Sequence, residues 1–283
     1  MPPSSAPADP LAAPHRWRDA LRALRGELHQ RLWVAGLIEP LRFTGELTVS
    51  AAQALTGGWH VRRADLLRVL AASSAQALAI VLVVNCLVGA ILAFVGAVQL
   101  VKFGAGIFVA DLVGIALARE MAAVITAVVM AGRTGAAFAA EIATMQVNEE
   151  IDALRVLGLD PVAYLALPRV LSLMALMPLL YVFGCLSGIL GGVAVGTGML
   201  ELSPVAYLDR TAKVLQWRHL WLGLSKSIVF GALVAWAGCY QGLRAQRDAA
   251  GVGLATTRAV VGSIVAVIVV DAIFAICANA LGV

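Results

Sequence analysis

The sequence is short of charge. Only 13% of its 283 residues are Asp, Glu, Lys or Arg, whereas about 25% are charged in an average soluble domain. Hydrophobic residues make up 61%, against about 45–50% in such a domain. A chain with so little polar surface is not suited to folding in water, and the composition therefore predicts a membrane protein.

The motifs of several chemistries are also missing. No Gly-x-x-x-x-Gly-Lys-Ser/Thr segment occurs, so the chain cannot bind ATP through a P-loop. No Ser/His/Asp arrangement suggests a hydrolytic site, and the histidines stand alone, so we predict neither a metal site nor a bound cofactor. The four cysteines fall in apolar segments without paired spacing. These absences argue against an enzyme, and no nucleic-acid partner is expected.

Long uncharged runs are present instead. Residues 69–101 and 170–200 carry no charge, and each run exceeds the roughly 20 residues that cross a bilayer as a helix. Three further apolar stretches reach that length with embedded ionisable groups. Helices are expected because a helix satisfies its own backbone in lipid, and the alternation typical of an outer-membrane barrel is absent. We predict an all-α polytopic membrane protein whose five transmembrane helices cover about 69–101, 109–132, 168–198, 220–243 and 259–281.

The N-terminal region differs from the rest. Residues 1–14 are rich in Pro, Ala and Ser and are predicted to be disordered rather than a signal peptide. Residues 15–65 form a basic amphipathic region suited to an anionic membrane surface, although a helix docked on protein is an alternative. A weaker amphipathic stretch runs from Leu41 to Leu55. Because nine of the 21 Lys and Arg precede residue 69, we expect a cytoplasmic N-terminus and, after five crossings, a periplasmic C-terminus.

A short polar helix is predicted at about 148–158, between the second and third spanning helices. Asn148 is suited to the N-cap and Gly158 to the C-terminal end. Its polar residues are Glu149, Glu150, Asp152 and Arg155. The helix is too short to span, so it should lie at the cytoplasmic end of the bundle, either as a docking point for a partner or as a connector resting on the bilayer.

Four charged residues fall deep inside predicted spans: Arg119, Glu120, Lys226 and Asp271. Each costs at least roughly 2.5–3.5 kcal/mol in the bilayer unless it is paired or hydrated. They could line a polar cavity for a lipid head group, which Gln99 could also face. Equally, they could form ion pairs that only lock the bundle together.

A glycine repeat marks the third spanning helix. One glycine recurs at every fourth position, at Gly184, Gly188, Gly192 and Gly196. Such a repeat makes a groove in which another helix can approach closely. That helix could belong to the same chain or to another subunit.

Several segments also carry a family resemblance. They are Ala-Arg-Glu-Met at 118–121, Ala-Gly-Arg-Thr-Gly-Ala-Ala-Phe-Ala-Ala-Glu-Ile at 131–142, Gly-Leu-Ser-Lys-Ser-Ile-Val-Phe at 223–230 and Gly-Val-Gly-Leu-Ala-Thr-Thr-Arg-Ala-Val-Val at 251–261. From about residue 66 to the end, the chain resembles the MlaE/YrbE family of ABC transporter permeases. One departure is Ala122–Ala123, where the family usually has Gly-Pro, and it predicts a straighter second helix.

The resemblance implies a permease domain at 66–283 in a bacterial inner membrane. It implies a homodimer with two copies of a separate cytoplasmic ATPase, which uses ATP and Mg²⁺ and whose groove receives the short helix. Glu149, Glu150 and Asp152 would then couple the two subunits. It also implies passage of phospholipid or related lipid to or from a periplasmic MCE-domain protein. The residues alone leave two other readings: a proton-driven secondary transporter using Glu120 and Asp271, and a non-transporting membrane anchor of a lipid-transfer complex.

Overall fold

A computed structural model describes residues 38–54, 63–200, 202–280 and 282. Contacts divide the chain into two units, Met1–Thr48 and Val49–Val283. The disordered segment and the basic helix predicted before residue 33 lie outside the described residues. Residues 38–54 form one helix in which Phe43 and Leu47 are buried and Leu41 is exposed.

Five helices in the described residues are long and apolar enough to cross a membrane. They cover Ala77–Phe103, Gly106–Val147, Val162–Leu200, Trp217–Leu243 and Ala249–Ala280. The described residues contain no strand. The predicted all-α fold with five spans is therefore confirmed.

The second spanning helix is longer than predicted. It comprises α3 (Val109–Ala116), α4 (Ala122–Met130) and α5 (Ala136–Val147), joined by π-helical turns at Leu117–Met121 and Ala131–Gly135. The prediction ended near residue 132 because Arg133 and Glu141 interrupt the apolar run. A helix tolerates such residues where it packs against protein or leaves the hydrocarbon.

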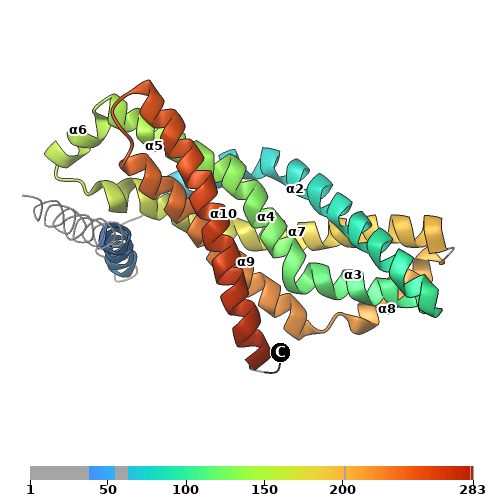
Figure 1. The fold of residues 1–283 in the computed structure, drawn as a ribbon. Helices are drawn as coiled ribbons and strands as arrows, with labels where there is room; N and C mark the ends of the chain where they lie inside the picture. Colours follow the sequence, from blue (N-terminus) through green and yellow to red (C-terminus); the bar gives the residue numbers. More distant parts are fainter. Residues whose placement is uncertain (1–37, 55–62, 201, 281, 283) are drawn as a thin grey trace, which may run out of the picture. The chain divides into compact units, whose positions relative to one another are not determined.

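This helix is also not straight. A π-helical turn is wider than an α-helical one and is a recognised cause of kinks. The first π turn directly precedes Ala122 and Ala123, and α3 and α4 run in different directions on either side of it (Figure 1). A π turn therefore bends this helix without proline, and the expectation that it is straighter than in other family members stays a prediction.

The other elements of this unit complete the bundle. They are α2 (Arg63–Leu100), α6 (Glu150–Val156), α7 (Leu167–Leu200, after a π-helical turn at Val162–Ala166), α8 (Pro204–Val214), α9 (Trp217–Leu243) and α10 (Ala249–Ala280). The fifth span thus begins ten residues before the predicted position 259, because Arg258 marked a boundary that the helix passes through. The third and fourth spans likewise begin a few residues earlier than predicted.

The two ends of the bundle carry different short helices. Figure 1 shows α6 beside the turn between α9 and α10, and α8 beside the start of α3. We call these the α6 end and the α8 end. Helix α8 has no counterpart among the predicted elements, because it is too polar to resemble a spanning helix. Pro204 at its first turn and the buried residues Tyr207 and Thr211, four apart, are signals of an amphipathic helix.

The glycine repeat of α7 is filled from within the chain. A Cβ added at Gly184 would lie 3.0 Å from the Asn85 side chain of α2, and one at Gly192 would lie 2.7 Å from the Tyr207 hydroxyl of α8. The Tyr207 ring also covers Gly196, and Leu117 covers Gly188. Of the two alternatives, packing within the chain accounts for this groove.

Candidate functional site

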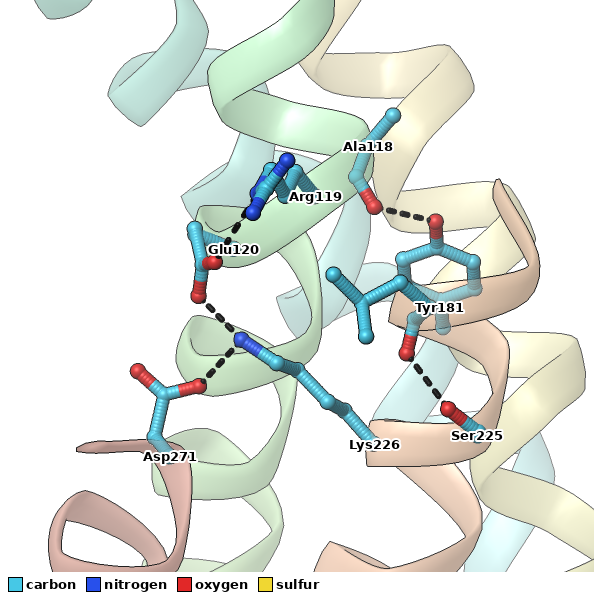
Figure 2. A network of polar contacts seen from close by, with 8 residues as sticks. Ala118, Arg119, Glu120, Tyr181, Ser225, Lys226 and Asp271 are labelled. Carbon is cyan, nitrogen blue, oxygen red and sulfur yellow. Dashed lines mark hydrogen bonds and ion pairs between the residues drawn. The ribbon is translucent and has the colours of Figure 1, made fainter. Parts of the chain in front are cut away.

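Lys226 is the centre of a polar network within the spanning helices. Its side chain is fully buried, and its Nζ forms ion pairs with Glu120 and, at 2.8 Å, with Oδ1 of Asp271. Figure 2 shows the ammonium group between the two carboxylates, which come from the second spanning helix and α10. Because an unpaired buried cation is costly, these two partners stabilise Lys226 in the bundle.

Arg119 extends the network on its accessible side. Its Nε lies 3.6 Å from Oε1 of Glu120. The side chains of Arg119, Glu120 and Asp271 are 25%, 24% and 25% exposed, whereas that of Lys226 is 0% exposed. The four groups, here called the polar network, therefore pair with one another and still present three of their members to the surroundings.

The first π turn of the second spanning helix presents Arg119 and Glu120. In this turn the Ala118 carbonyl accepts a hydrogen bond of 2.5 Å from the buried Tyr181 hydroxyl of α7 (Figure 2). Gly223 lets α9 approach the same point, since an added Cβ would collide with the Ala118 carbonyl and the Tyr181 ring. The turn is thus fixed between α7 and α9.

His219 is a further polar residue close to the network. It is buried at 8% exposure, and its Nδ1 has no hydrogen-bond partner among the described residues. The positive charges of Arg218 and Arg119 contribute to its electrostatic environment. In the sequence this histidine stands alone. Its spacing of seven residues from Lys226, which places both on one face of α9, is the signal that links it to the network.

Gln99 lies elsewhere. It is exposed near the end of α2, at the α8 end of the bundle. Its side chain makes none of the contacts that join the polar network.

Helix α6 is shorter than predicted. It covers seven residues, Glu150–Val156, and begins after Glu149 rather than Asn148. Because α5 continues to Val147, Asn148 ends that helix and cannot begin the next one. Glu149 takes the left-handed conformation, with φ of 59°, that reverses the chain. Gly158, at φ 75°, ends the helix as predicted.

Asp152 ties α6 to the rest of the α6 end. Its carboxylate accepts hydrogen bonds from Arg155, at 2.9 Å, and from Arg247 in the turn before α10, at 2.6 Å. Ile151 is fully buried, whereas Val156 and Leu157 are 88% and 73% exposed. The helix is therefore anchored on one side and presents apolar and acidic residues on the other.

A second ion pair fixes α8 at the opposite end. Arg210 forms a two-pronged pair with Asp111 of α3, with 2.7 Å between Nη2 and Oδ2, and lies 4.8 Å over the Phe108 ring. Tyr207 is completely buried, and this burial raises its pKa to about 12. This contact is not visible in the sequence because its partners are 99 residues apart.

Five spanning helices around an internal charged network, with short helices at both ends, define a multi-pass membrane protein. The chain belongs to the MlaE permease family, since the family model described as Permease MlaE matches residues 66–277.

Curated relatives agree. A probable ABC transporter permease protein of Synechocystis is 34% identical over 246 residues, which is 87% of this chain and 92% of the relative. One from Rickettsia conorii is 40% identical over 181 residues, or 64% of this chain and 70% of the relative. The chloroplastic protein TRIGALACTOSYLDIACYLGLYCEROL 1 of Arabidopsis thaliana is 33% identical over 217 residues, covering 77% and 61%. The chain is therefore a membrane permease subunit.

Proposed function

We propose that this chain is the permease subunit of an ABC transporter that moves phospholipids or related lipids between the inner membrane and a periplasmic MCE-domain partner. A second copy of the chain completes the membrane part, and two copies of a separate ATPase supply the energy. The observation that carries the lipid assignment is the polar network inside the spanning helices.

The network suits an amphipathic substrate. Charged groups within membrane spans mark substrate pathways, and a lipid combines a charged head group with chains that the surrounding apolar helices accept. Arg119 is partly exposed, and a guanidinium group binds phosphate oxygens in a two-pronged manner. The name of the Arabidopsis relative contains a glycolipid, which supports a lipid class of substrate.

The exposed residues of the α6 end support the proposal that a separate ATPase docks there. Exposed Glu149, Glu150, Val156 and Leu157 give a partner both acidic and apolar contacts. A displacement of α6 would reach the turn before α10 through the pair of Asp152 with Arg247. The α6 end would face the cytoplasm, with the N-terminus cytoplasmic and the C-terminus periplasmic.

The test is transport by the whole complex in liposomes. The permease and its ATPase are reconstituted, and transfer of a labelled phospholipid to the MCE-domain partner is measured with ATP, without ATP, and with the proton gradient collapsed. We expect transport that requires ATP and survives loss of the gradient. Transport that persists without ATP but stops when the gradient collapses would instead establish the proton-driven reading through Glu120 and Asp271.

Two variants separate a transporter from an anchor. Glu120→Gln keeps the size of the side chain but removes its charge, so transport should fall while the complex still assembles. Asp209→Asn, in an exposed pair with Lys213 on α8, is the matched control and should transport normally. Assembly with unchanged transport in Glu120→Gln would show that the network takes no part in moving lipid.

A further inference from the structure

A cavity of about 500 Å³ lies between α7 and α9, separate from the polar network. Its walls include Tyr181, Val182 and Leu186 of α7 and Trp217 and Trp221 of α9. Its volume is within the roughly 300–1,000 Å³ of ordinary ligand pockets. The Tyr181 hydroxyl already donates its hydrogen bond to the Ala118 carbonyl. Tyr181 therefore presents its apolar ring to a ligand in the cavity.

The cavity opens on the outer surface of the bundle. Val182 and Leu186 are 43% and 55% exposed, and Trp217 and Trp221 are 76% and 63% exposed. All four belong to segments that are long and apolar enough to span a membrane, so a bilayer around these segments would place lipid at the opening. The opening also reaches the first turn of α9 at the α8 end, and Trp side chains concentrate at the membrane–water interface.

We propose that this cavity binds one acyl chain of a bilayer phospholipid, whose head group lies at the α8 end. A lipid chain matches the lining and is present at high concentration at the opening. Arg218, exposed between the two Trp residues in sequence, provides a cation at the level of the phosphate. A partner helix, with a diameter of about 10–12 Å, requires a wider groove than a single chain does.

The cavity lies directly against the π turn of the second spanning helix. Its inner wall includes Ala118, whose carbonyl is held by Tyr181, and the next two residues of the same π turn are Arg119 and Glu120. The bound chain therefore packs against the turn that presents half of the polar network. This lipid site is separate from any site at the network, and its occupancy requires neither ATP nor transport.

The first test maps the occupant of the unaltered cavity. A photoreactive amino acid is introduced at Leu186 in the full chain, and its matched control is introduced at Leu190, which is 62% exposed on the same helix but outside the cavity. The detergent-purified complex is washed to remove loosely held lipid, irradiated and analysed by mass spectrometry. We expect a phospholipid adduct at Leu186 that is several-fold more abundant than at Leu190. Equal adducts at both positions, or an adduct with protein at Leu186, would overturn the proposal.

The second test fills the cavity. Val182→Phe places a ring in it, whereas Leu179→Phe adds a ring at a residue that is also exposed on α7, at 54%, but outside the cavity. The adduct at Leu186 should be lost in the first variant and kept in the second, and an adduct that survives Val182→Phe contradicts the proposal. The adduct is measured without ATP, so a failure of the proposed transport function leaves this readout unaffected.

Discussion

Replacement of Lys226 by Met removes the only cation that contacts both Glu120 and Asp271 among the described residues. Removal of one partner from a buried ion pair costs about 3–5 kcal/mol, since the remaining charge stays buried without compensation. The two carboxylates are about a quarter exposed, which lets water reach them and favours the lower end of that range. We therefore expect the free energy of unfolding to fall by about 3 kcal/mol.

The assay is denaturant titration of the purified chain in mixed micelles, followed by the loss of helical circular dichroism. A triple variant provides the control, in which Glu120→Gln and Asp271→Asn accompany Lys226→Met. The triple variant neutralises the three groups that meet at Lys226 together, and joint replacement of buried ionic partners is often nearly neutral, so it should recover most of the lost stability. Arg119 keeps its charge, but its side chain is 25% exposed. The reasoning is refuted if Lys226→Met is as stable as the wild type, or if the triple variant is no more stable than the single one.

Three further predictions concern packing, coupling and backbone conformation. Gly191→Ala should lower the folded yield, because its added Cβ collides with the α2 backbone and overpacking destabilises the fold by about 1–3 kcal/mol. Gly198→Ala is the control and should fold normally, because there is open space around Gly198. Asp152→Asn should weaken the stimulation of ATP hydrolysis by lipid in the reconstituted complex, while Asp209→Asn should not. Glu149→Gly should raise the thermal unfolding midpoint, with a gain of up to about 1 kcal/mol, because its φ of 59° is a conformation that glycine adopts without strain.

Each has an outcome that contradicts it. Equal yields of the two glycine variants would mean that α7 and α2 separate easily. Normal stimulation in Asp152→Asn would show that α6 does not transmit its contact through this carboxylate. A lower midpoint in Glu149→Gly would mean that contacts of the glutamate side chain outweigh its backbone strain.

The sequence predicted the number of spans well because uncharged length is a direct requirement of the bilayer. It predicted their ends less well. The second span passes through Arg133 and Glu141, and the fifth passes through Arg258. A charged side chain does not interrupt the backbone hydrogen bonds of a helix, so the helix continues past it.

The candidate site was predicted as a set of residues but not as an arrangement. Arg119, Glu120, Lys226 and Asp271 stood out because charge is expensive in lipid. Their pairing could not be read from the sequence, since Lys226 and its partners are 106 and 45 residues apart. His219 was missed because its burial depends on how α9 packs.

The short helices were also predicted only in part. Gly158 identified the end of α6 correctly, because the left-handed conformation favours glycine. Glu149 adopts the left-handed conformation at the other end of α6, although glutamate does not favour it. The residue type therefore gave no indication of this turn. Helix α8 was overlooked because only two of its residues are buried.

The π turn at Leu117–Met121 has a consequence for the rotational setting of the second spanning helix. It is equivalent to a one-residue insertion that the helix absorbs, and one residue corresponds to about 100° of rotation. Deletion of one residue there would leave an unbroken helix but would swing α3 around its axis relative to α4. Asp111 would then turn away from Arg210 at one end while α5 kept its place at the other. The extra residue allows both ends of one helix to fit their partners, each end being oriented independently of the other.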